Sequence, residues 1–165
     1  MLLGGQALAG TEKTVYGYVE KVTLVENNLT ITAKLDTGAK TASLSAIKIT
    51  AVEIDDKPHL KFLVPTKKGN VSFVCEYAGL VTIKPREGES KVHSILKGGI
   101  KRPVVKMRIN LDNKERELLV NLTNRKRFIY PLLLGRESIK AFDGVVDPAV
   151  RFSVKHKKTI KFQSE

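Results

Sequence analysis

The sequence contains one cysteine, Cys75, and no tryptophan. A single cysteine excludes an internal disulfide, and because Phe73 and Val74 flank Cys75, we expect its thiol in the core rather than at a reactive site. No apolar run approaches the ~18 residues that a membrane-spanning helix needs, so no such span is predicted. Acidic residues are scarce, with 17 Asp and Glu against 29 Lys and Arg and a formal charge of +12. This excess favours anionic partners, although it also simply keeps a protein dispersed.

The two ends of the chain differ from its middle. Residues 1–13 contain a small-residue pattern around Ala7 and Ala9 that is similar to a signal-peptidase site, but the apolar stretch is short and no basic start precedes it. We expect an N-terminal tail that is either a trimmed export signal or a disordered extension. A trimmed export signal predicts a periplasmic or secreted protein, and the alternative is a cytoplasmic one. Residues 14–165 fit a single domain. The basic clusters at 125–127 and 155–158 are expected to be a solvated turn and a solvated tail.

Short alternating segments dominate residues 15–154. They predict strands at 15–25, 29–35, 43–54, 60–64, 71–77, 80–83, 105–111, 115–122 and 145–154. The segment Pro85–Ser90 is expected to be an exposed loop, and 159–162 a further strand. The strands 145–154 and 159–162 can close the sheet or pair with a partner. Only Arg136–Phe142 has a helical pattern. We therefore predict an all-β, barrel-like fold with one short helix.

A strand ending in Leu35-Asp36-Thr37-Gly38-Ala39 is the stretch with the clearest chemistry. Leu29, Ile31, Ala33 and Leu35 share one face of this strand, so it delivers Asp36 to a tight turn. Glycine at position 38 permits backbone angles that other residues avoid. Alone, Asp-Thr-Gly is also compatible with an ordinary strand-ending turn.

About a hundred residues later, Leu132-Leu133-Leu134-Gly135-Arg136 is an apolar run that stops at a glycine. Asp-Thr-Gly-Ala followed by apolar-apolar-Gly-Arg resembles the signature pair of retropepsin-like aspartic proteases. The resemblance implies a closed acid-protease barrel, with Asp36 catalytic and Leu133, Leu134, Gly135 and Arg136 supporting its turn from below.

The longer motif from Ala33 to Thr41, together with Arg102-Pro103-Val104-Val105, is more specifically similar to a bacterial family. Its members are labelled ATP-dependent zinc proteases and occur alongside an ATP-grasp glutamate ligase. The match runs from about Val15 to about Phe152. The resemblance also implies that Gly98, Gly99 and Ile100 belong to a flap over bound peptide, although two glycines alone suit any hairpin tip.

One Asp-Thr-Gly per chain implies a homodimer. Two carboxyls in close contact cannot both ionise, so a pair of Asp36 side chains would share one proton and supply acid and base together for water attack on a peptide bond. The chain is too short for two such lobes, and a two-fold interface would bring the second Asp36 from a partner. The resemblance implies that Thr37 braces the two turns across the axis and that Gly38 and Ala39 complete each turn.

Lys40 departs from the family pattern, because many retropepsins carry there an acidic residue that pairs with the Arg of the Gly-Arg motif. Arg136 therefore lacks its usual partner. Substrate binding must differ, and Lys40 with the basic composition favours an acidic peptide or protein substrate.

Other functional classes fit less well. His59, His93 and His156 lie far apart in the sequence and no metal-binding spacing or phosphate-binding glycine loop occurs, so no metal or cofactor is expected. A basic barrel that binds single-stranded nucleic acid would need exposed aromatics, which are few, so no nucleic acid is expected. A protease-like module that binds peptides without cleaving them stays open.

Overall fold

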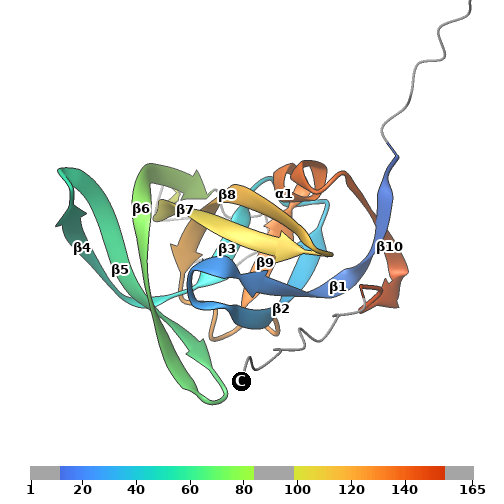
Figure 1. The fold of residues 1–165 in the computed structure, drawn as a ribbon, viewed down its shortest axis with the longest axis horizontal. Helices are drawn as coiled ribbons and strands as arrows, with labels where there is room; N and C mark the ends of the chain where they lie inside the picture. Colours follow the sequence, from blue (N-terminus) through green and yellow to red (C-terminus); the bar gives the residue numbers. More distant parts are fainter. Residues whose placement is uncertain (1–11, 84–98, 155–165) are drawn as a thin grey trace, which may run out of the picture.

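The computed structural model describes residues 12–83 and 99–154, and its strands form one continuous sheet that closes on itself (Figure 1). The order is β10-β1-β2-β9-β3-β8-β7-β6-β5-β4, and an additional pairing of β1 with β7 joins β1, β2, β9, β3, β8 and β7 into a ring. The predicted all-β closed barrel with one short helix is therefore confirmed.

The elements have the following bounds. They are β1 (Thr14–Leu24), the 3-10 turn η1 (Val25–Asn27), β2 (Leu29–Asp36), β3 (Ala42–Ser45), β4 (Ile47–Ile54), β5 (Lys57–Thr66), β6 (Gly69–Ile83), β7 (Ile100–Leu111), β8 (Lys114–Thr123), β9 (Leu132–Gly135), α1 (Arg136–Ala141) and β10 (Gly144–Arg151).

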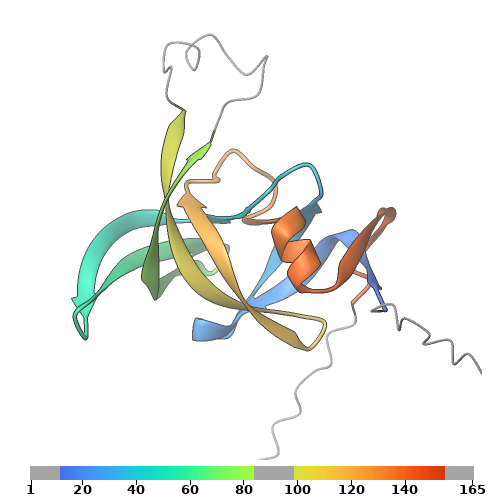
Figure 2. The ribbon, with the colours of Figure 1, turned by 90° about the horizontal axis from the view of Figure 1, so that it is seen from above.

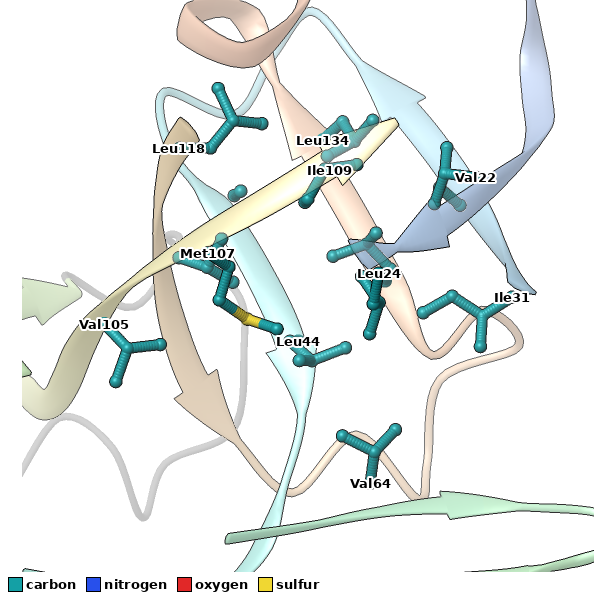
Figure 3. Close-up of a cluster of buried hydrophobic side chains, with 14 of the residues drawn as sticks. Val22, Leu24, Ile31, Leu44, Val64, Val105, Met107, Ile109, Leu118 and Leu134 are labelled. Atoms are coloured by element: carbon teal, nitrogen blue, oxygen red, sulfur yellow. The ribbon is translucent and has the colours of Figure 1, made fainter. Parts of the chain in front are cut away.

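The barrel interior is filled by the alternating apolar residues that the sequence pattern predicts. Figure 3 shows them converging from different strands, among them Leu24 of β1, Leu44 of β3, Met107 of β7 and Leu134 of β9. All four side chains are fully or almost fully buried. Strand alternation places every second residue of these strands on the opposite face, where the polar groups of the site lie.

Beyond the ring, β4, β5 and the first half of β6 form an antiparallel extension, drawn at the left of Figure 1. Its inner face joins the same core: Phe62 and Phe73 stack with ring centroids 5.8 Å apart, and Cys75 is buried as expected. Aromatic stacking adds to the free energy gained from burying these rings. The extension is therefore part of the same domain core rather than a separate unit.

Two hairpins end in two-residue turns of positive φ, Asp55-Asp56 and Asp112-Asn113. Asp and Asn tolerate this conformation better than most residues, and such turns match the twist of the flanking strands. The hairpin of β7 and β8 therefore has the register that the sequence predicts.

Three predictions about elements need correction. The expected strand 43–54 is divided at Ala46, because β3 enters the barrel between β8 and β9 while β4 leaves it to pair with β5. The segments 71–77 and 80–83 are one strand, β6, that continues through an irregularity at Gly79. Residues 145–154 do not close the barrel: β10 pairs in parallel with β1 at the edge of the sheet. The predicted loop at 85–90, the basic tail at 155–158 and the strand at 159–162 lie outside the described residues.

Glu20 of β1 is a fully buried carboxylate. Its Oε1 accepts hydrogen bonds from the N–H of Gly17 at 2.7 Å, the N–H of Ser153 at 3.0 Å and the hydroxyl of Ser153, and its Oε2 accepts one from the N–H of Val154 at 3.3 Å. A buried charge is tolerated when hydrogen bonds of this kind satisfy it. Glu20 thereby fixes the chain that follows β10 against β1.

Candidate active site

Asp36 is the last residue of β2 and begins a tight turn. Its Oδ1 accepts a hydrogen bond from the N–H of Gly38 at 3.0 Å, and its carbonyl oxygen accepts one from the N–H of Ala39 at 3.2 Å. The Asp36 side chain is 20% exposed, whereas Thr37 and Gly38 are exposed. The turn therefore holds a carboxylate in a fixed position with one side open to solvent.

The second predicted motif lies directly beside this turn. Strand β9 pairs in parallel with β2, and its last pair joins Asp36 to Gly135. A Cβ at position 135 would lie 2.6 Å from the carbonyl oxygen of Thr41 and 2.7 Å from that of Lys40, so only glycine permits this contact. Leu134 is buried in the core, and Leu133 lies half-buried on the opposite face.

Helix α1 begins where β9 ends and binds the far side of the turn. The N–H of Arg136 donates to the carbonyl oxygen of Ala39 at 2.8 Å, and the N–H of Glu137 donates to that of Lys40 at 3.2 Å. These donors would otherwise be unpaired at the start of a helix. The structure thus brings the two sequence motifs together through backbone contacts, although among the described residues no hydrogen bond or ion pair involves the guanidinium of Arg136.

Lys34 is a neighbour of Asp36 that sequence reasoning missed. Its Nζ lies 3.4 Å from Oδ2 of Asp36, because the two residues share one face of β2. Burial raises the pKa of Asp36, but the charge of Lys34 and the hydrogen bonds from Gly38, Lys34 and Ala39 outweigh it and lower the pKa below its ordinary value. In a single chain, Asp36 is therefore an anion rather than an acid.

A cross-strand row of five residues, three of them polar, crosses the wall of the barrel on the same face. It consists of Lys34, Leu133, Ser43, Asn121 and Val104, which are neighbours in the register of β2, β9, β3, β8 and β7. Ser43 and Asn121 are buried although both are polar. This cross-strand row connects the strand of Asp36 to the strand that follows the predicted flap.

Asn121 links the far end of this row to the loop that carries Asp36. Its Nδ2 donates to the carbonyl oxygen of Ala42 at 2.5 Å and to the hydroxyl of Thr41 at 3.3 Å, while its Oδ1 accepts from Nη1 of Arg102 at 3.4 Å. Alternation along β8 places Asn121 on the face opposite Val120 and Leu122. Although polar, Asn121 is buried there together with its hydrogen-bond partners.

Arg125 corrects the expectation of a solvated basic turn at 125–127. Only 6% of it is exposed. Its Nε donates to the carbonyl oxygen of Tyr130 at 3.2 Å, its N–H donates to Oγ of Ser45 at 3.3 Å, and its guanidinium lies 4.2 Å from the ring centroid of Phe128. Its neighbours Lys126 and Arg127 are exposed as expected.

The charges of Arg102 and Asp36 both act on Arg125. Burial lowers the pKa of Arg125, the positive charge of Arg102 lowers it further, and the negative charge of Asp36 opposes both. Burial likewise lowers the pKa of Arg102. Such effects fade with distance, so Arg102 and Asp36 both lie close enough to Arg125 to influence its charge.

The predicted flap residues are only partly described. Gly99, with φ of +74°, directly precedes β7, and Ile100 is the first residue of β7 and pairs with Ile83 of β6. Gly98 lies outside the described residues. Figure 2 shows the paired ends of β6 and β7 projecting from the barrel, but no hydrogen bond among the described residues joins Gly99 or Ile100 to the Asp36 turn.

One chain supplies one reactive carboxylate at this site. Among residues 12–83 and 99–154, no hydrogen bond or ion pair joins Asp36 to a second acid or a histidine, and no group of three or more His, Cys, Asp or Glu side chains is placed to hold a metal ion. An anionic Asp36 can act as a base, but peptide hydrolysis by two carboxyls also needs an acid.

Comparison with known proteins agrees with the two motifs. A family model described as RimB-like, retropepsin-like aspartic endopeptidase RimB, matches residues 15–157. A crystal structure of protein Lpg0085 from Legionella pneumophila subsp. pneumophila str. Philadelphia 1, of unknown function, is 53% identical and superposes with a TM-score of 0.75, covering 87% of this chain and all of the other.

A probable alpha-L-glutamate ligase from Shewanella pealeana is 29% identical over 131 residues, which are 77% of this chain. The matched region is 26% of that relative, so the chain spans about a quarter of its length. Within the described part of the chain, no helix is long and apolar enough to cross a membrane.

Proposed function

Because the chain belongs to the RimB-like family of retropepsin-like aspartic endopeptidases, we propose that it hydrolyses peptide bonds as a homodimer in which each chain contributes Asp36. The observation that carries this proposal is the position of Asp36: a partly exposed carboxylate at the end of a buried strand, held by the N–H of Gly38 and paired with Gly135 of the second motif.

The chemistry requires a second copy of the same turn. In a two-fold dimer, the interface is self-complementary, so Thr37 and Gly38, which are exposed here, meet their own counterparts. The two Asp36 carboxyls then share one proton, one acting as base toward water and the other as acid toward the carbonyl oxygen of the substrate. The pKa values belong to the pair, and contact with a second carboxylate raises one of them above that of the isolated chain.

The proposed substrate is a peptide or protein. The positive charge of this chain supports a substrate that is acidic. Lys34 forms an ion pair with Asp36, the charges of Asp36 and Arg102 both act on Arg125, and the chain has a formal charge of +12. Lys40 adds an exposed cation at the turn where many relatives carry an acid. The similarity of the chain to part of a probable alpha-L-glutamate ligase makes a glutamate-rich peptide the first substrate to test.

Asp36→Asn tests the proposal. The wild-type chain should cleave an oligo-α-glutamate peptide, Asp36→Asn should not, and specific activity should rise with protein concentration as dimers form. Asp147→Asn, an acid of the edge strand β10, is the matched control and should retain activity. Equal cleavage by wild type and Asp36→Asn would contradict the proposal. Binding of the peptide by both proteins without cleavage would favour a peptide-binding module instead.

A further inference from the structure

We infer that Arg102 and Arg125 form a subsite that binds a carboxylate side chain of the substrate and so determine specificity at the proposed active site. This inference rests on the proposed function and assigns to two residues a role that the motifs do not contain. It is argued from hydrogen bonds, burial and charge at the far end of the cross-strand row.

The two arginines lie at the same end of neighbouring strands. Val104 of β7 pairs with Asn121 of β8, and the strands are antiparallel, so Arg102 and Arg125 both lie beyond this pair in the same direction. Figure 2 shows the end of β8 beside the first part of β7. Asn121 joins Arg102 to the loop after the active-site turn, since its side chain bonds to both Arg102 and Thr41.

In the part of the chain that the structure describes, neither arginine forms an ion pair with an acid. The ion pairs among residues 12–83 and 99–154 include Arg108 and Arg116 but neither Arg102 nor Arg125. Burial penalises the charge of both guanidinium groups, and the like charge of Arg102 adds to this cost at Arg125. The charge of Asp36 acts in the opposite direction, but the pKa of Arg125 still stays below its ordinary value. A bound anion would relieve this cost, and guanidinium groups match the geometry of a carboxylate.

Unpartnered polar atoms lie at the same place. Within the described ranges, Nε of Arg102 and Oγ of Ser43 are buried without a hydrogen-bond partner. Ser43 is the partner of Asn121 in the register of β3 and β8. Buried polar groups are normally satisfied, so a donor and a hydroxyl left over next to Asn121 indicate a site completed by a bound group. The two oxygens of a peptide carboxylate can accept hydrogen bonds from Nε of Arg102 and Oγ of Ser43. Its negative charge also compensates the positive charge of the arginines.

The test compares an oligo-α-glutamate peptide with an oligo-glutamine peptide of the same length, which is neutral but similar in shape. Variants Arg102→Gln and Arg125→Gln are measured beside Arg108→Gln, which removes the same charge from the outer face of β7. We expect Arg102→Gln to lower kcat/KM for the glutamate peptide about tenfold or more, as for the loss of one charged hydrogen bond, while the glutamine peptide changes by less than about twofold. Arg108→Gln should change neither, and Arg102→Lys should restore part of the preference.

Binding to the Asp36→Asn protein separates this inference from the proposed function. Suppose that wild-type protein cleaves neither peptide. The subsite is still supported if the protein binds the glutamate peptide more tightly than the glutamine peptide and if Arg102→Gln abolishes this difference. If wild-type protein cleaves and Arg102→Gln reduces both peptides equally or neither, the inference is overturned while the proposed function stands.

Two further outcomes are decisive. Weaker dimers of Arg102→Gln with unchanged peptide preference would show that the arginines bind an acidic group of the second copy, and would overturn the inference. Should Arg125→Gln fail to fold because Arg125 is buried, Arg102→Gln decides the question alone, since Arg102 is only partly buried.

Discussion

Asp36 and Gly135, a hundred residues apart in the sequence, are direct partners in the parallel pairing of β2 with β9. The backbone of Lys40 and Thr41, which follows the Asp36 turn, lies directly against Gly135 and leaves no room for a side chain at position 135. The position of Asp36 therefore depends on packing between two motifs and not on its turn alone.

Gly135→Ala should displace the Lys40-Thr41 backbone and the turn attached to it. We expect a loss of ~1–3 kcal/mol in the free energy of unfolding, as for other overpacked sites. Activity should fall about 100-fold, because small displacements of catalytic groups are costly. Urea unfolding and peptide hydrolysis measure the two effects.

Gly69→Ala is the control for this variant. Gly69 has φ of +121° with nothing within 4 Å of an added Cβ, so its substitution strains the backbone at a turn far from Asp36. It should lower stability and leave activity per folded dimer unchanged. An active Gly135→Ala protein would contradict the supporting role of β9.

Lys34→Met should raise the pKa of Asp36, because the charge and hydrogen bond of Lys34 help to lower it. The acid limb of the pH profile of kcat/KM reports ionisation in the free enzyme, so it should move to higher pH. A lowered folded-state pKa gives stability that is present above the unfolded-state pKa and lost as pH falls through the folded-state pKa. Lys34→Met should therefore also reduce the stability gained by ionising Asp36.

The matched control is Lys21→Met on the adjacent strand β1. Nζ of Lys21 donates to Oγ1 of Thr32 at 2.7 Å and makes no ion pair with Asp36. The pH profile of Lys21→Met should coincide with that of wild type. If Lys34→Met and Lys21→Met shift the acid limb equally, the cause is the total charge of the protein and not the contact between Lys34 and Asp36.

Glu20→Ala should cost about 2–4 kcal/mol in the free energy of unfolding, because it leaves buried backbone N–H groups of Gly17, Ser153 and Val154 without an acceptor. Chemical denaturation of this variant and of Glu53→Ala, an exposed acid on β4, gives the comparison. Equal stability of the two variants would refute the claim that Glu20 fixes the segment after β10.

Cys75 should be unreactive in the folded protein. Burial, assisted by the negative charge of Glu26, raises the pKa of its thiol to about 12. The thiolate is the reactive form, so a disulfide reagent near pH 8 should label Cys75 only when the protein unfolds. Labelling of the native protein as fast as of the unfolded chain would show that the thiol is accessible.

The sequence patterns predicted those parts of the fold in which one face of a strand is apolar. Val105, Met107, Ile109 and Leu111 alternate without interruption, and all four are buried on one face of β7 as expected. The pairing of the two motifs was also predicted, although from resemblance rather than from alternation. The direct pair of Asp36 with Gly135 confirms that they meet.

The polar groups of the site could not be found in this way. Arg125 and Asn121 look like surface residues, because periodicity counts charge and polarity as signs of exposure. They are buried through contacts that depend on tertiary structure, namely the loop before β9 for Arg125 and the end of β3 for Asn121. The division of 43–54 at Ala46 was missed for a similar reason, since both parts are β-prone and only their partners differ.

The position of the second carboxylate tests the central claim most directly. A crystal structure of the assembled protein should show two chains related by a two-fold axis, with the nearest oxygens of the two Asp36 side chains about 3 Å apart. A protein that stays monomeric at every concentration, or a dimer that keeps the two Asp36 carboxylates far apart, would contradict it.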